Sequence, residues 1–188
     1  MAISGKQRLL TVDIVNNKLI KKETIKTNGV LILVQKYSEK SILVLAKHAD
    51  GKFCLQVLDL IGNVLTHIPI SEHLESPRFM RMSTNRDIIY VTDIRNGCYG
   101  FSLQRSTLFH YSQPNVKVYG GLAVDHHDCV YLRVVDQKGR HLTKLSPSGQ
   151  CLQRRGSGYG CPLRFDGSKL YLVGKNAQNE RVINYIFV

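Results

Sequence analysis

A strand-and-turn pattern recurs about every 40 residues along this chain of 188 residues. Each copy holds an apolar strand, a turn rich in Asn, Asp or Gly, and a second strand, and further strands fit between the copies. A repeat of this length is typical of a four-stranded β-propeller blade. The spacings of 33, 47, 41 and 40 residues separate the anchor residues Leu9, Ile42, Ile89, Val130 and Leu170.

This repeat predicts an all-β fold, a β-propeller of four-stranded antiparallel blades, with about four to four and a half blades present. No long segment shows the apolar period of 3.6 residues that a helix would require. We therefore expect a single domain over residues 1–188, with blade units anchored near residues 9, 42, 89, 130 and 170.

Apolar runs and cysteines indicate the cellular compartment of the protein. The longest apolar run, residues 30–34, has the length of a strand, and no signal-peptide pattern follows the N-terminal residues. We expect a cytoplasmic protein that does not enter a membrane. The cysteines form no C-x-x-C pair or zinc spacing, so we expect no metal site and no cofactor, and mostly buried thiols. They are Cys54, Cys98, Cys129, Cys151 and Cys161.

The basic charge changes its character along the chain. The net charge is +12. Residues 1–69 hold one arginine, Arg8, whereas residues 70–188 hold eleven. A guanidinium grips phosphate or carboxylate with two-point contacts, so an arginine-rich surface favours polyanionic partners. A basic surface without a specific partner is the alternative.

One blade has a recognisable motif. Residues 120–132 read Gly-Gly-Leu-Ala-Val-Asp-His-His-Asp-Cys-Val-Tyr-Leu, and the preceding blade carries Asp93 and Asn96 in its turn. These segments resemble the NHL repeat, and Lys47 and Gly174 depart from it where the turn aspartate would fall. The chain is similar to the C-terminal propeller of tripartite-motif proteins, especially divergent invertebrate members. It carries no RING, B-box or coiled-coil pattern, so ubiquitin-ligase chemistry is not expected within it.

The resemblance implies a propeller that usually has six blades. We therefore expect this chain to be the C-terminal part of a longer propeller, or to pair with another chain that completes the ring. It also implies a non-catalytic scaffold that recognises a protein partner or substrate, in the ubiquitin pathway by resemblance. The alternative is binding of single-stranded RNA, whose backbone basic residues follow and whose bases stack on aromatic rings.

Arginines and tyrosines of the later blades are the candidate binding residues. Equivalent positions of rotated blades would gather on one propeller face, which would suit RNA or an acidic peptide. We expect Tyr99, Tyr111, Tyr119 and Tyr159 to be surface rings and Tyr90, Tyr131 and Tyr171 to belong to the core. The candidate site consists of Arg78, Arg81, Arg95, Tyr99, Arg133, Arg154, Arg155, Tyr159 and Arg164.

No catalytic residues are expected. His126, His127 and Asp128 fall where the repeat predicts a turn, and adjacent histidines in a strand would point to opposite faces. Residues 156–160 are glycine-rich but lack the Lys-Ser/Thr of a phosphate loop. A third alternative is a calcium-dependent propeller lactonase or esterase, but its carboxylates would have to come from hairpin turns.

Overall fold

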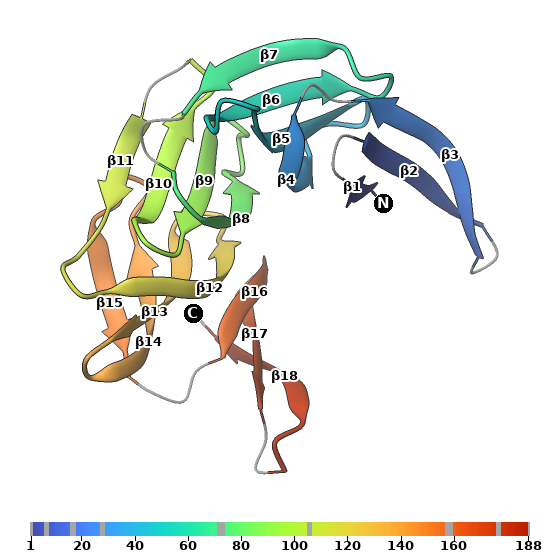
Figure 1. Ribbon diagram of the computed structural model, residues 1–188. Coiled ribbons are helices and arrows are strands. Elements are labelled where there is room, and N and C mark those ends of the chain that lie inside the picture. Colours follow the sequence, from blue (N-terminus) through green and yellow to red (C-terminus); the bar gives the residue numbers. More distant parts are fainter. Residues whose placement is uncertain are drawn as a thin grey trace. The chain divides into compact units, whose positions relative to one another are not determined.

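The computed structural model describes residues 2–5, 8–15, 18–26, 29–70, 74–104, 107–156, 160–175 and 178–187 (Figure 1). These residues form eighteen β-strands in five antiparallel sheets. The all-β prediction is confirmed, and eighteen strands correspond to the expected four and a half blades of four strands. No helix in the described part of the chain is long and apolar enough to cross a membrane.

Strands follow one another in simple meanders, in which each strand pairs with the next along the chain. The first sheet contains β1 (Ala2–Gly5), β2 (Arg8–Val15) and β3 (Lys18–Lys26). The second contains β4 (Val30–Lys36), β5 (Ser41–Lys47), β6 (Phe53–Asp59) and β7 (Val64–Pro69). The third contains β8 (Pro77–Met82), β9 (Ile88–Asp93), β10 (Gly97–Ser102) and β11 (Thr107–Tyr111).

The last two sheets continue the same order. One contains β12 (Lys117–Val124), β13 (Val130–Asp136), β14 (Gly139–Leu145) and β15 (Cys151–Arg155). The other contains β16 (Cys161–Asp166), β17 (Lys169–Lys175) and β18 (Arg181–Phe187). Each predicted anchor residue lies in the second strand of its sheet, so the sequence repeat coincides with the structural repeat.

The four-stranded sheets share their irregularities as well as their order. In each of them the register shifts once or twice between the first and second strands and again between the third and fourth. In the third sheet, for example, the shifts lie between Pro77 and Phe79 and between Gly100 and Phe101. An extra residue in one strand increases the local twist, and strongly twisted sheets are typical of propeller blades.

The chain divides into two compact units, residues 1–74 and residues 75–188. In the first unit β1 contacts β4, and in the second unit β8, β12 and β16 contact one another in turn. First strands therefore lie next to first strands within each unit. The expectation of a single domain over 1–188 stays a prediction.

The core of the first unit lies on both faces of β5 and β6. Leu43, Val44 and Leu45 are consecutive and all fully buried, although neighbouring residues of a strand point to opposite faces. One of these faces carries an apolar cluster made of Leu31, Ile42, Val44, Ala46, Cys54 and Leu58.

The second unit contains two apolar clusters. The larger one joins residues of the third and fourth sheets, and Tyr90 belongs to it, as expected. Tyr131 is also buried as expected, whereas Tyr171 is only partly buried. The smaller one joins the fourth and fifth sheets through Tyr131, Leu170 and Leu172. Packing between successive sheets is thus continuous along this unit.

Buried aspartates hold the ends of the strands in place. Asp93 is fully buried, and its carboxylate accepts hydrogen bonds from the backbone N–H groups of Glu75, Ser76, Arg95 and Asn96, at 2.6–3.1 Å. These contacts give a physical reason for the aspartate of the turn motif, because its carboxylate satisfies N–H groups that no strand can pair.

Asp125 has the same role in the next sheet. It accepts hydrogen bonds from the backbone N–H groups of His127 and Cys129 at 2.9 and 2.8 Å, and from the Tyr131 hydroxyl at 3.0 Å. Asp125, which ends the Gly-Leu-Ala-Val-Asp segment, and Tyr131, which follows in the same motif, are therefore direct partners across the first hairpin of the blade.

Phe109 of β11 packs against two glycines. A Cβ atom added to Gly100 would lie 2.4 Å from Phe109 Cε1, and one added to Gly149 would lie 2.3 Å from Phe109 Cδ2. Gly149 also has a φ of +83°, a conformation that few other residues adopt. The ring is buried in the space that these glycines leave, next to Tyr90.

We expect Gly100→Ala to destabilise the second unit by about 1–3 kcal/mol, because the new methyl group would overlap the Phe109 ring. Gly156→Ala is the matched control, since no atom lies within 4 Å of the added Cβ. Urea unfolding of both variants measures the difference. Equal stability of the two would contradict this account of the packing.

We expect Asp93→Ala to lower the free energy of unfolding by about 2–4 kcal/mol, because it leaves buried N–H groups without an acceptor. Asp93→Asn should retain part of the stability, since its amide oxygen still accepts hydrogen bonds. The exposed Asp166 provides the control, and its alanine variant should change stability by less than about 0.5 kcal/mol. Chemical denaturation followed by circular dichroism is the measurement.

Candidate functional site

The candidate binding residues that the structure describes all belong to the second unit, but they occupy different strands. Arg78 and Arg81 lie on β8, Arg95 in the turn after β9, Arg133 on β13, Arg154 and Arg155 on β15, and Arg164 on β16. Tyr159 lies outside the described residues. Arg81 and Arg164 hold the same register position in their sheets, opposite Tyr90 and Tyr171 of the second strands. The other candidates lie on different strands, so most of the positions are not equivalent from blade to blade.

Several of these arginines have intramolecular partners. Arg95 Nη1 lies 3.2 Å from Glu75 Oε2, and both side chains are exposed. Arg133 Nη1 donates a hydrogen bond to Cys161 Sγ at 2.9 Å. Arg81 Nη1 donates to the carbonyl of Met80 at 3.0 Å, and burial lowers the pKa of its guanidinium. Arg78 and Arg164 are exposed.

Arg154 is the centre of a polar cluster. Its Nη2 donates a hydrogen bond to the Tyr111 hydroxyl at 2.9 Å and another to Gln113 Oε1. Its Nη1 lies 3.9 Å from Asp136 Oδ2, while Asp136 Oδ1 lies 2.9 Å from His141 Nε2. The hydrogen bond from His141 is the main reason why the pKa of the Asp136 carboxyl lies below its ordinary value. The nearby Asp136 carboxylate thus partly compensates the positive charge of Arg154.

Arg155 follows Arg154 on β15 and points to the other face of the strand, because neighbouring side chains alternate. It lines a small hollow together with Tyr131, Lys144 and Ile186. Arg154 and Arg155 therefore do not act on one ligand from the same side of the sheet.

Two of the four expected surface tyrosines are buried. Tyr99 is 3% exposed and stacks on His110, with ring centroids 4.1 Å apart, and burial raises its pKa to about 12. Tyr111 is also buried, so the expectation of surface rings at these two positions is wrong. Tyr119 is exposed as expected, and Tyr159 is outside the described residues.

The turn expected at His126 and His127 is confirmed. Both residues lie in the turn between β12 and β13, and both are exposed. Asp128, at the end of this turn, accepts a hydrogen bond from the backbone N–H of Thr84 at 2.6 Å, and its carbonyl accepts one from the Tyr90 hydroxyl at 3.2 Å. The segment therefore links two sheets of the second unit.

Exposed basic side chains outnumber exposed acidic side chains among the described residues of the second unit. Two of its carboxylates, Asp93 and Asp125, are buried and hydrogen-bonded to backbone N–H groups. Among its described residues, four Asp and Glu side chains are exposed: Glu75, Asp87, Asp166 and Glu180. Ten Lys and Arg side chains are exposed: Arg78, Arg86, Arg95, Lys117, Lys138, Arg140, Arg154, Arg164, Lys175 and Arg181.

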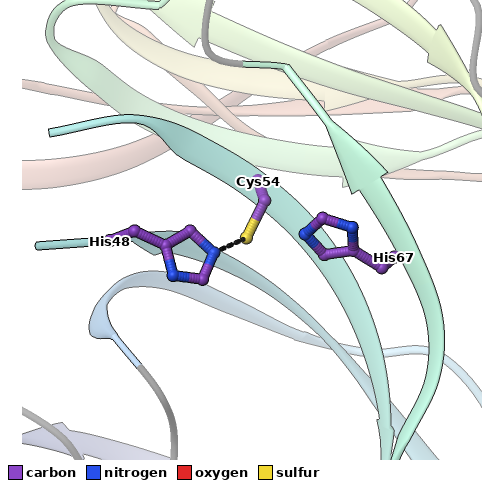
Figure 2. A group of neighbouring side chains, drawn as sticks. All are labelled: His48, Cys54 and His67. Carbon is purple, nitrogen blue, oxygen red and sulfur yellow. Dashed lines mark hydrogen bonds between the residues drawn. The ribbon is translucent and has the colours of Figure 1, made fainter. Parts of the chain in front are cut away.

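The first unit brings together three side chains that sequence spacing did not single out. His48 follows β5, Cys54 lies on β6 and His67 lies on β7. Their ligand atoms all lie within 4.8 Å of one another, and Figure 2 shows the thiol between the two rings. His48 Nε2 lies 3.0 Å from Cys54 Sγ.

The three side chains of this group differ in their exposure to solvent. Cys54 is 1% exposed, His48 is half-buried and His67 is exposed. Burial, with a smaller contribution from Asp50, raises the pKa of the Cys54 thiol to about 11. The ring centroids of the two histidines lie 6.3 Å apart. Whether the chain lacks a metal, as its cysteine spacing predicts, stays a prediction.

Comparison with known proteins supports the fold. No protein-family model matches the sequence, and no curated protein matches it. Among solved structures, the chain is similar to the β-propeller domain of Cps50 (Swd1) from Myceliophteria thermophila, with 10% identity and a TM-score of 0.72. The match covers 100% of this chain and 66% of that one.

Two further structures match at 11% identity and a TM-score of 0.60. One is a protein of unknown function from Bacteroides caccae, with 98% of this chain and 70% of that chain covered. The other is a protein from Lactobacillus plantarum, with 97% and 65% covered. The chain thus spans about two thirds of the length of these proteins. The propeller fold is confirmed, while the NHL and tripartite-motif resemblance stays a prediction.

Proposed function

We propose that the chain is a non-catalytic interaction scaffold whose second unit recognises an acidic segment of a protein partner. The observation that carries this proposal is the surface of that unit, where the described residues include ten exposed Lys and Arg side chains and four exposed Asp and Glu side chains. An excess of one charge sign attracts a partner of the opposite sign and speeds its association.

The way in which the second unit places its charges supports a binding role for its excess of exposed basic side chains. Asp93 and Asp125 direct their carboxylates inward to backbone N–H groups. Asp125 also lies 3.7 Å from Nζ of the partly buried Lys144, and neither carboxylate is exposed beside the exposed lysines and arginines. Arg78 and Arg164 are exposed on first strands of their sheets. A guanidinium at such a position can bind a carboxylate with two parallel hydrogen bonds.

Binding of single-stranded RNA is the second candidate. It needs aromatic rings on which bases stack, and each stacked base contributes about 1–3 kcal/mol. Tyr99 and Tyr111 are buried, and Tyr119 is the exposed ring among the three predicted surface tyrosines that the structure describes. A carboxylate-rich peptide needs charge and hydrogen bonds but no stacking platform. Tyr185 and Phe187 are exposed as well, but the Lys169 ammonium lies over both rings, 4.9 and 5.7 Å from their centroids. The surface therefore favours the protein partner.

The absence of catalytic activity belongs to this proposal. A calcium-dependent lactonase would need carboxylate oxygens that converge on one ion. Asp93 and Asp125 instead direct their oxygens at the backbone of their own turns. A tripartite-motif type of scaffold in the cytoplasm is the specific form that we propose. The Asp125 to Tyr131 hydrogen bond, which joins two motif residues, supports it.

Pairing with another chain is also part of the proposal. β18 is the third and last strand of its sheet in the described residues, and it exposes Ile183, Tyr185 and Phe187 on one face. An open strand edge with apolar side chains is a template for another strand. Sedimentation should show self-association that Tyr185→Lys reduces. A wild-type chain that stays monomeric at high concentration would contradict pairing between copies.

The charge proposal is tested by fluorescence anisotropy with two labelled probes, a short polyglutamate peptide and an oligouridylate of equal charge. We expect the wild-type chain to bind the peptide at least as tightly as the RNA. The double variant Arg78→Glu and Arg164→Glu should weaken peptide binding by about tenfold, equivalent to about 1.4 kcal/mol.

The control variant carries Lys40→Glu and Lys52→Glu, which make the same change in net charge at exposed sites of the first unit. It should change the affinity by less than about twofold, because these two lysines do not belong to the unit that carries the proposed binding surface. Equal losses in both variants would show that net charge alone drives binding. Tighter binding of the oligouridylate would favour RNA, and binding of neither probe would contradict both functions.

A further inference from the structure

The register of the second sheet places His48, Cys54 and His67 on one face. Ala46 pairs with Cys54, and Gln56 pairs with His67. Side chains at every second position share a face, so Cys54 and Gln56 lie on the same face as His67. The backbone N–H of His48 continues the ladder by donating to the carbonyl of Lys52 at 2.8 Å, which puts His48 on the face of Ala46.

Cys54 is therefore the middle of a diagonal row across three neighbouring segments. His48 is its diagonal neighbour on one side and His67 on the other, a separation that side chains of this length can span. Figure 2 shows both rings turned towards the sulfur. Regular pairing along β5, β6 and β7 brings these donors together, without any special loop.

Two imidazole nitrogens and one sulfur form a ligand set for borderline-soft transition-metal ions. Zn²⁺ binds Cys sulfur at about 2.3 Å and His nitrogen at about 2.0–2.1 Å, so tetrahedral geometry separates its donors by roughly 3.3–3.6 Å. The three donor atoms here lie within 4.8 Å of one another, and the His48 and Cys54 atoms are 3.0 Å apart. Because His67 is exposed, its ring can rotate to adjust the remaining distances.

We propose that His48, Cys54 and His67 form a binding site for a divalent transition-metal ion of the Zn²⁺ class. On binding, the Cys54 thiol gives its proton to solvent and its sulfur forms a bond to the metal, while both histidines coordinate as neutral imidazoles. Three protein donors leave a fourth position for water or for a donor from a partner. The metal would join the turn after β5 to β7 across β6.

A comparison with a second buried thiol shows what distinguishes Cys54. Cys98 is also fully buried, but its Sγ lies 4.0 Å from the carbonyl of Tyr99, which is not a metal-ligand arrangement. Cys54 has an imidazole nitrogen within hydrogen-bond distance and a second imidazole close by. The Asp50 carboxylate lies close enough to influence the thiol and adds negative charge beside the site.

Titration of the metal-free chain with Co²⁺, followed by absorption, tests the proposal. We expect one equivalent to bind with a thiolate-to-metal charge-transfer band and with the intense visible bands of four-coordinate cobalt. Zn²⁺ should displace the cobalt and abolish the spectrum. The urea midpoint of the chain should rise when Zn²⁺ is added, because a ligand that binds the folded state stabilises it.

His67→Ala is the decisive variant, because the exposed position can be changed without disturbing the core. It should weaken Co²⁺ binding roughly a hundredfold or more, since loss of a direct ligand exceeds the 10–100-fold effect of an outer-shell partner. Cys54→Ser should remove the charge-transfer band. The controls, His126→Ala and Cys151→Ser, replace an exposed histidine and an exposed thiol elsewhere and should bind like wild type.

A spectrum without the thiolate band would overturn the site, as would equal affinities of His67→Ala and wild type. Loss of the signal in Cys151→Ser would place the metal elsewhere. If Cys54→Ser fails to fold by circular dichroism, His67→Ala and the wild-type thiolate band still decide the question.

Discussion

Burial of both faces of the second strands β5 and β9 is the constraint on which this structure depends. Leu43, Val44 and Leu45 are consecutive and fully buried, and so are Ile89, Tyr90 and Val91. Consecutive side chains of a strand point in opposite directions, so both faces must be covered by other elements. Full burial of one large apolar side chain contributes about 1.5–3 kcal/mol, which a single sheet in water would lose on one side. Sheets of this kind must therefore stack, and the sequence repeat exists because each sheet needs neighbours.

Apolar faces on both sides confine polar groups to strand ends and turns. There the backbone N–H groups of the turns need acceptors, and Asp93 and Asp125 supply them from buried positions. Each such carboxylate removes a negative charge from the surface. The lysines and arginines cannot be buried in the same way, because their cationic heads remain in water while their stems cover apolar surface. Burial of these two carboxylates thus adds to the excess of basic residues that the sequence of the second unit already has.

The parts of the fold that follow from local pattern could be predicted from the sequence. The anchors Ile89 and Val130 lie in second strands because a short apolar run flanked by turn residues has few other solutions. Tyr99 could not be placed in this way. It follows a turn beside Arg95, which favours exposure, but β10 is buried on both faces and the ring stacks between Phe101 and His110.

Contacts between side chains of different strands could not be predicted from the sequence either, because the local pattern does not show which strands pack together. Arg154 looked available for a ligand, yet Tyr111 and Gln113 approach it from the end of β11 and Asp136 from the end of β13. One signal was present: Asp136 and His141 flank a tight hairpin whose register places them close together.

The histidine and cysteine donors show this limit most clearly. Their spacing, His-x5-Cys-x12-His, corresponds to no zinc pattern built on a loop, and they meet only because of the registers of β5 with β6 and of β6 with β7. A site built on strand register differs physically from a loop site. The strands fix Cys54 at 1% exposure, so its sulfur cannot swing away, whereas His67 is exposed and can. In the proposed site the metal would enter and leave on the His67 side, and the affinity would depend on that one mobile ligand.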